Sequence, residues 1–478
     1  MNYSIIRYVL GTVLKFESLF LCLPMMVALI YREDCALDFF IVMIICLLTG
    51  VALSFRKPKS YVFYALEGFI CVSLSWIMLS LFGALPFWMS GEIPSFIDSL
   101  FEAISGFTTT GASILSDVEA LSHGCLFWRS FTHWIGGMGV LVFVLAVFPL
   151  RGGQAMFLMK AESPGPSVEK LVPRVKTTAF ILYAVYTVMT VAEIVLLAVT
   201  GMPFFDAVTL SLGTAGTGGF GVLNDSVGSY APHLQVIITV FMILFGVNFN
   251  AYYLVLRKKP LNALSEEVRA YLGIILVTSL AIAWNIRHIF PNPLEALRHA
   301  SFQVASVMTT TGFSTTDFNN WPVFSTTILV ILMYIGACAG STGGGIKVSR
   351  ILILIKSVVQ ELFLVKHPHG VGAVKMDRRI VDKDIVRAVH TFLASYVVIN
   401  MISLLLISLD NFDFTTNFTA VAATLNNIGP GLSLVGPASN FGLFSDFSKL
   451  VLMFDMLTGR LELMPMLVLF APMTWRRS

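Results

Sequence analysis

The sequence predicts an all-α polytopic membrane protein with four repeats of helix, half-helix, loop and helix, preceded by two extra N-terminal helices. Hydrophobic residues make up 56% of the 478-residue chain and charged residues only 12%, with a mean hydropathy of +0.82, which is typical of chains that span a bilayer. Apolar runs of helical length recur throughout, and the alternating segments of a membrane β-barrel are absent. A short glycine-containing segment also occurs four times.

The repeated segment divides the chain. It reads FTTTGAS at 107–113, GTAGTGGFG at 213–221, VMTTTGFST at 307–315 and LNNIGPG at 425–431. Its marker glycines are Gly111, Gly219, Gly312 and Gly429. They lie roughly 100 residues apart, which accommodates two spanning helices and a hairpin. The segment before each marker holds about ten helical residues, or roughly 15 Å, and is therefore expected to be a half-spanning helix.

The expected units follow from these markers. They are an N-terminal helix pair over 1–60, pore repeat 1 over 61–155, repeat 2 over 170–260, repeat 3 over 265–366 with an intramembrane glycine-rich loop, and repeat 4 over 380–478. Lys15 and Glu17 argue against a signal peptide, so the first pair is expected as helices near 5–30 and 36–55. About ten full crossings result. The six cysteines form no CxxC pair and predict neither a disulfide framework nor a metal site.

Charge placement predicts the orientation. The connections between repeats are basic at 56–59, 257–259 and 375–379, as short cytoplasmic loops usually are, so both termini are expected in the cytoplasm. Acidic residues accompany the glycine segments on the other side, which suits cation entry. They are Asp98, Glu102, Asp117, Glu119, Asp206, Asp225, Glu295, Asp317, Asp413 and Asp446.

The glycine segments can supply oxygen ligands. A dehydrated monovalent cation needs its water replaced by oxygen dipoles, and rings of backbone carbonyls provide them if glycine permits the unusual torsions. The expected ion-binding filter around a central pore is Thr109, Thr110, Gly111, Thr217, Gly218, Gly219, Thr310, Thr311, Gly312, Asn427, Ile428 and Gly429. The alternative is that these small residues only help helices to pack.

Longer motifs carry a family resemblance. WRSFTHWIGGMG (128–139), AESPGP (161–166), GACAGSTGGGIKVSR (336–350), ATLNNIGPG (423–431) and GRLE (459–462) resemble the Trk/Ktr/HKT potassium transporters. The match is best with the membrane subunit of bacterial Trk systems. The resemblance implies K⁺ as the bound and transported ion, a homodimer, a peripheral cytosolic nucleotide-binding regulatory subunit and the bacterial cytoplasmic (inner) membrane. Glycine at all four markers resembles potassium-preferring members, although loops 2 and 4 lack the TTTG form.

Two features predict a gate. Five glycines among residues 336–345 should unwind a helix beneath the third loop, and the expected gate residues there are Gly340, Ser341, Thr342, Gly343, Gly344 and Gly345. The alternative is a GxxxG packing seam.

Arg460 is the second feature. An arginine at the expected centre of the last crossing costs at least about 3 kcal/mol unless it faces water or is paired. It is expected to point into the pore, with an ion pair to Asp455 or Glu462 as the alternative. Lys347 and Arg350 are expected to face a partner or lipid headgroups.

Other functions have less support. GTGGFG at 216–221 lacks a preceding strand, and GSTGGGIK at 340–347 lacks the lysine and hydroxyl of a phosphate loop, so no nucleotide is expected on this chain. No catalytic pattern predicts an enzyme, and no nucleic-acid partner is expected. The sequence favours potassium uptake through a gated, channel-like pore. A secondary transporter coupling K⁺ to H⁺ or Na⁺ is the alternative, with ionisable groups expected at the bilayer midplane. A structural anchor would not need four loops.

Overall fold

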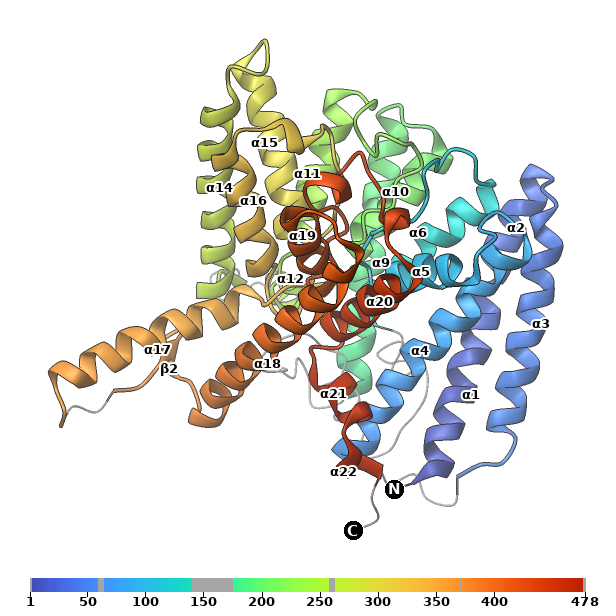
Figure 1. The fold of residues 1–478 in the computed structure, drawn as a ribbon, viewed down its shortest axis with the longest axis horizontal. Helices are drawn as coiled ribbons and strands as arrows, with labels where there is room; N and C mark the ends of the chain where they lie inside the picture. The colour runs from blue at the N-terminus through green and yellow to red at the C-terminus, as the bar shows by residue number, and fades with distance from the viewer. Residues whose placement is uncertain (1, 59–63, 140–174, 258–262, 370–371, 476–478) are drawn as a thin grey trace.

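The chain is almost entirely helical, which confirms the predicted fold class. The computed structural model describes residues 2–58, 64–139, 175–257, 263–369 and 372–475 (Figure 1). Within these residues the strands are confined to a small hairpin, in which β1 (Lys375–Met376) pairs antiparallel with β2 (Arg379–Ile380). The last part of predicted repeat 1 (140–155), the first part of predicted repeat 2 (170–174) and the AESPGP motif (161–166) lie outside the described residues.

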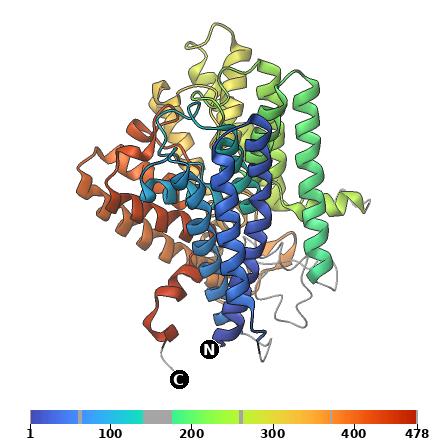
Figure 2. The same cartoon turned by 90° about the vertical axis from the view of Figure 1, so that its right-hand side faces the viewer.

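The N-terminal helix pair forms one side of the molecule (Figure 2). Helices α1 (Tyr3–Phe20) and α2 (Cys22–Tyr31) follow each other with a break at Leu21, and α3 (Cys35–Ser54) returns along them. The pair packs closely, since a Cβ on Gly11 would lie 2.6 Å from the Gly50 carbonyl oxygen. The largest buried apolar cluster joins this pair to the first and fourth repeats.

The helix and half-helix of each repeat are present in the expected order. They are α4 (Ala65–Met89) with α5 (Phe96–Phe107), α9 (Val175–Val199) with α10 (Phe204–Gly216), α14 (Glu266–Ile286) with α15 (Pro293–Met308), and α18 (Lys383–Ile407) with α19 (Phe414–Leu425). The half-helices have 12, 13, 16 and 12 residues, or about 18–24 Å. Ser95, Asn292 and Asp413 begin three of them by accepting backbone hydrogen bonds at the N-cap.

The closing helix of each repeat is shorter than expected. These helices are α6 (His123–Gly137), α11 (Pro232–Phe245), α16 (Val323–Ile335) and α20 (Asp446–Arg460), with 15, 14, 13 and 15 residues. In the described residues six helices are long and apolar enough to cross a membrane, or seven if α11 and α12 (Phe249–Leu256) count as one span bent by 90°. Glycine or left-handed residues interrupt these closing helices, so the described closing helices are not continuous spans. The expected ten full crossings stay a prediction.

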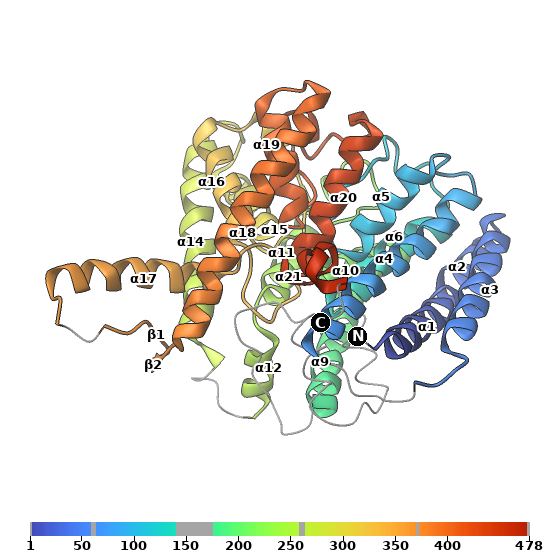
Figure 3. The same cartoon turned by 60° about the horizontal axis from the view of Figure 1, so that its bottom comes forward.

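The remaining helices follow these breaks. Helix α17 (Val348–Lys366) projects away from the bundle (Figure 3), and α21 (Met464–Phe470) and α22 (Pro472–Trp475) lead to the C-terminus. Short 3₁₀ turns are η1 (Phe318–Asn320), η2 (Ser408–Asp410), η3 (Ser433–Val435) and η4 (Phe441–Leu443). Both chain ends lie at the same end of the molecule (Figure 1).

Candidate functional site: four glycine loops and the helix breaks beneath them

All four half-helices end in the same backbone motif. A residue one or two positions after the end of each half-helix is left-handed: Thr109 (φ 56°), Thr217 (φ 55°), Thr310 (φ 59°) and Asn427 (φ 56°). The next amide donates to the carbonyl five residues back: Thr110 to Ser105 (2.9 Å), Gly218 to Gly213 (2.9 Å), Thr311 to Ser306 (2.8 Å) and Ile428 to Ala423 (2.9 Å). This is the Schellman pattern. Three of the four left-handed residues are β-branched threonines, and such strain is usual where function fixes the backbone.

The marker glycines form a closed ring. A Cβ on Gly111 would lie 1.9 Å from the Gly218 oxygen, one on Gly219 would lie 2.0 Å from Thr311 O, one on Gly312 would lie 2.1 Å from Ile428 O, and one on Gly429 would lie 2.9 Å from Thr110 O. Each glycine therefore faces the carbonyl of the next loop, and loop 4 faces loop 1. The four glycines have φ between 76° and 97° and line one open cavity. Glycine is required here by both torsion and space.

The ring brings neutral oxygen atoms together. The expected residues of loops 109–111, 217–219, 310–312 and 427–429 all lie at the C-terminal ends of the half-helices, where the helix dipole is negative. Hydroxyl pairs reinforce two loops, Thr108 with Thr110 at 2.8 Å and Thr309 with Thr311 at 2.7 Å. The Asn427 side chain joins loops 4 and 1 by donating to Thr110 Oγ1 at 2.9 Å. Such a site can stabilise a cation without a formal charge.

A buried ion pair that the sequence analysis did not predict supports loop 1. Arg129 and Glu102 are 2% and 1% exposed and 2.8 Å apart. Glu102 also accepts from the Ser113 hydroxyl and the Ile114 amide, while Arg129 lies over the Phe220 ring of loop 2 at 4.0 Å. Breaking such a pair leaves an uncompensated buried charge.

The expected acidic mouth is thus less negative than its composition indicates. Glu102 is neutralised by Arg129, which itself lines the cavity above the glycine ring. Asp98, in the first turn of α5, pairs with Lys449 of α20 at 2.5 Å. Both cations come from closing helices that the sequence did not place opposite the acids.

The glycine-rich segment 336–347 is an irregular loop between α16 and α17. Backbone hydrogen bonds close its base, from Ile346 to Tyr334 (3.2 Å), Lys347 to Ile335 (2.9 Å) and Val348 to Ala337 (3.1 Å). Its tip reaches the third glycine loop, because the Gly344 amide donates to Thr310 Oγ1 at 2.6 Å. Two of the residues expected for the gate, Gly343 and Gly344, therefore lie directly against the loops of the glycine ring.

This loop rests on the α11–α12 break. The Cys338 amide donates to Gly246 O at 3.1 Å, and the Phe249 amide donates to Gly340 O at 3.0 Å. The Thr342 hydroxyl donates to Phe245 O at 3.4 Å. The sequence analysis missed this second break, although the GVN triplet at 246–248 offers a signal for it in an otherwise apolar run.

Arg460 connects three of the breaks. It is the last residue of α20, and α21 begins four residues later at Met464, so the last crossing is interrupted at this arginine. Its guanidinium donates to Thr342 O at 2.8 Å, Gly136 O at 2.5 Å and Gly137 O at 2.7 Å. Backbone carbonyls inside a helix are hydrogen-bonded to the helix itself, so these carbonyls can accept from Arg460 only because α6 and α16 have ended there.

The two acids proposed as ion-pair partners of Arg460 have other contacts. Asp455 accepts from the Ser403 hydroxyl at 2.6 Å, and Glu462 forms an ion pair with Arg350.

Comparison with known proteins decides the family. The model of the TrkH family, described as a cation transport protein, matches residues 36–477. The chain belongs to this family. It is 38% identical to the Trk system potassium uptake protein TrkH of Salmonella typhimurium and 37% identical to that of Escherichia coli K12, with full coverage of both chains in each case. The crystal structure of the potassium transporter TrkH from Vibrio parahaemolyticus matches with a TM-score of 0.89 at 33% identity, over 100% of each chain.

Membership of the TrkH family confirms two predictions. The chain is an integral membrane transport protein rather than an enzyme, and the resemblance noted from its motifs holds over nearly its whole length. The family description does not assign roles to residues, so the filter and gate residues stay predictions.

Two basic residues of this TrkH family member lie where the sequence did not place them. Lys347 and Arg350 are only 2% and 5% exposed, so the expectation that they face a partner or lipid is wrong. The Lys347 ammonium donates to Gly343 O within the loop. Arg350 pairs with Glu462 and lies over the Phe392 ring at 4.0 Å. A buried arginine needs such a partner because desolvating the charge alone is costly.

Glu267 is a further residue that the sequence analysis missed. Its Oε1 accepts from the Ala339 amide at 2.7 Å and from the Ser349 amide at 3.1 Å. One buried carboxylate therefore holds both ends of the glycine-rich loop, while Arg460 holds its middle. The residue sits in the first turn of α14, where a sequence reading assigns a glutamate to helix capping.

Proposed function

We propose that this protein takes up potassium across the bacterial cytoplasmic membrane through a gated pore whose selectivity filter is the ring of four glycine loops. The observation that carries the proposal is the cyclic contact of the marker glycines, each with the carbonyl of the next loop. The relatives named as potassium uptake proteins of Trk systems support potassium as the ion. Neutral carbonyl rings replace the hydration shell of K⁺ at little cost.

The four loops contribute in the same way through their backbones. The carbonyls of residues 109 and 110, 217 and 218, 310 and 311, and 427 and 428 form successive rings along the pore. Left-handed torsions before each glycine set the direction of these carbonyls. Because the ligands are backbone atoms, the unequal side chains of loops 2 and 4 leave the walls chemically similar where the ion binds.

The glycine-rich loop and Arg460 close the path beneath the filter. In the closed state Arg460 binds the Thr342 carbonyl, and the loop tip binds Thr310 of the third filter loop. The positive guanidinium also repels cations at this level. Opening requires the loop to leave Arg460, and its glycines permit the change of torsion.

One buried carboxyl group favours the coupled transporter as a second candidate. Asp455 is fully buried on α20, and its Oδ2 has no hydrogen-bond partner among the described residues. Ionisable groups inside a membrane often relay protons. Proton-coupled K⁺ entry would make uptake in Asp455→Asn independent of an imposed proton gradient.

Rubidium flux into proteoliposomes containing this chain alone separates the two candidates. Passive influx that K⁺ inhibits better than Na⁺, and that is unchanged by a proton gradient, supports the channel-like pore. Accumulation above equilibrium that needs the gradient, and that Asp455→Asn abolishes, supports coupling instead. No flux of either kind contradicts both.

Assembly and orientation belong to the same proposal. The relatives' names place them in a multi-component system, which supports a peripheral cytosolic nucleotide-binding subunit. Both termini lie at one end of the molecule (Figure 2) with the basic connection at 56–58, so we place that end in the cytoplasm. Single cysteines labelled from either side test the orientation.

Helix α17 exposes five apolar side chains, which supports a homodimer as one way to cover them. They are Ile355, Val358, Val359, Leu362 and Phe363.

A further inference from the structure

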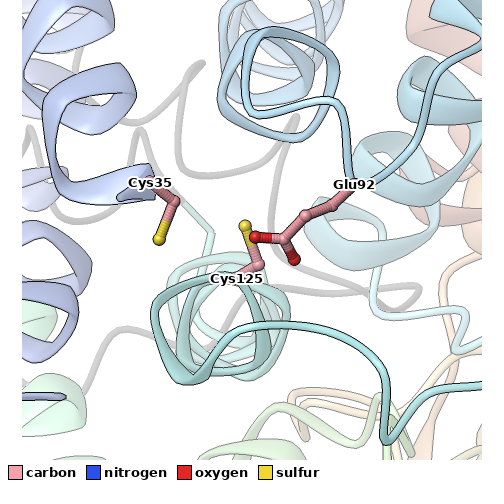
Figure 4. Close-up of side chains that lie close together, drawn as sticks. All are labelled: Cys35, Glu92 and Cys125. Carbon is pink, nitrogen blue, oxygen red and sulfur yellow. The ribbon is translucent and has the colours of Figure 1, made fainter. Parts of the chain in front are cut away.

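Two cysteines and a glutamate from three separate segments lie close together (Figure 4). Cys35 is the first residue of α3, Cys125 lies in the first turn of α6, and Glu92 lies between α4 and α5. One donor atom from each residue lies within 4.8 Å of the others. Both thiols are buried, at 5% and 0% exposure. No CxxC spacing links them, so only the fold brings them together.

The surroundings of this cluster are polar and acidic. The Ser122 hydroxyl lies 3.3 Å from Cys35 Sγ and donates to Glu92 Oε1 at 2.6 Å. Glu33 Oε2 lies 3.9 Å from Cys35 Sγ, and its other oxygen accepts from the His123 amide at 2.7 Å. Among the described residues no lysine or arginine forms an ion pair with Glu92.

We propose that Cys35, Cys125 and Glu92 bind one divalent cation of the zinc class. Zn²⁺ takes thiolate and carboxylate ligands in tetrahedral geometry, with Zn–S distances of about 2.3 Å and hence sulfur atoms about 3.8 Å apart. Small side-chain rotations bring the three donors to that spacing. Water or Glu33 Oε2 completes the four ligands. A bound cation also compensates the otherwise unpaired negative charge of this cluster.

Cys35 and Cys125 both lie in the first turn of a helix. A bound cation of the zinc class deprotonates the thiols that coordinate it. The thiolate is the form that binds metal. Soft thiolate ligands select zinc-class ions over potassium, so this site is distinct in chemistry from the glycine ring.

The proposed ion would join the N-terminal helix pair to the first repeat. Cys35 belongs to the pair, whereas Cys125 belongs to α6, and the far end of α6 supplies the Gly136 and Gly137 carbonyls to Arg460. The Tyr31 and His123 rings stack at 3.8 Å beside the cluster and hold α2 of the helix pair against α6. The cation would therefore stabilise the contact through which the extra helices touch the pore repeats.

The test is titration of the full-length, detergent-solubilised chain, reduced and freed of metal, with Cd²⁺ as the spectroscopic probe. We expect a thiolate-to-cadmium ultraviolet band that saturates at about one equivalent per chain and is displaced by Zn²⁺. Cys35→Ser and Cys125→Ser should each abolish it. Cys46→Ser, a buried cysteine farther along α3, is the matched control and should keep it. Glu92→Gln should weaken binding at least about tenfold.

Three outcomes would overturn the proposal. The first is the absence of the band in the unsubstituted chain, which remains decisive even if the serine variants do not fold. The second is retention of the band in both serine variants. The third is a peptide pair linked through Cys35 and Cys125 in protein purified without reductant, since mass spectrometry would then identify a disulfide in place of the metal site. In contrast, protection of these two thiols from alkylation by Zn²⁺, with Cys46 unaffected, would support it.

Discussion

The glycine ring and the helix breaks beneath it are each built from all four repeats. The four loops of the ring are alike, whereas the four breaks differ from one another. In the ring, four loops with different side chains share left-handed torsions within a few degrees and the same contact with the next loop. Below it, α6 ends in glycines, α11 turns by 90°, α16 opens into a long loop and α20 ends at an arginine. The break after α20 carries Arg460, and the loop after α16 carries Lys347.

In the proposed pore this difference separates two tasks. Binding an ion on the axis needs oxygen atoms from all sides, so every repeat must present the same backbone. Closing the pore needs only one movable segment, so a single loop and a single arginine suffice. The other helix breaks can then supply the contacts that hold this loop and arginine in place. The variants below test the comparison by altering one layer at a time.

The largest effect is expected in the ring itself. Gly111→Ala places a carbon 1.9 Å from the Gly218 oxygen, so loop 1 must shift and Rb⁺ flux into proteoliposomes should fall about 100-fold. Gly273→Ala on α14 is the control, because nothing lies within 4 Å of the added carbon. Size-exclusion profiles should show both variants folded. Flux at the normal level in Gly111→Ala would remove loop 1 from the pathway.

A smaller effect of opposite sign is expected in the lower layer. Arg460→Ala removes charge-assisted hydrogen bonds to three carbonyls, each worth about 1.5–3 kcal/mol. Basal flux should rise at least about tenfold, since 1.4 kcal/mol corresponds to a factor of ten in an equilibrium. Arg387→Ala, at an exposed ion pair on α18, should leave flux unchanged. Unaltered open probability in single-channel recordings of Arg460→Ala would assign Arg460 a structural role.

Glu267→Gln should have a weaker effect in the same direction. Glutamine keeps an oxygen acceptor for the Ala339 and Ser349 amides but loses the charge, so the loop ends are held less firmly. We expect basal flux to rise about threefold, within the range of one weakened hydrogen bond. Glu266→Gln is the neighbouring control, because Glu266 pairs with Lys356 away from the loop. Equal changes in the two variants would contradict a specific role of Glu267.

The smallest effect tests whether the four loops are equivalent. Thr109→Asn places in loop 1 the residue type that loop 4 already has at Asn427, and asparagine tolerates the left-handed torsion better than threonine. Flux and the K⁺ to Na⁺ preference should stay within about twofold, and stability should be unchanged or up to about 1 kcal/mol higher. Thermal unfolding measures the second quantity. Loss of selectivity would show that the threonine side chain is needed in addition to the backbone.

Composition and local pattern were enough to predict the fold class, the half-helices and the marker glycines. A half-helix and its left-handed end depend on residues that are neighbours in the chain. The left-handed residue is a threonine or asparagine two positions before each marker glycine. The break of α16 was predictable for the same reason, because five glycines lie together at 336–345. The filter and gate roles assigned from these patterns await the flux measurements.

Tertiary structure decided which of these local features meet. Glu102 was read as part of an acidic mouth, and Arg350 as a headgroup ligand, because the sequence shows charge but not burial or partners. The closure of the glycine ring, the contact of Arg460 with α6 and the meeting of Cys35 with Cys125 all join residues from different repeats or units. Such contacts depend on the packing of whole helices, and no short stretch of sequence contains that information.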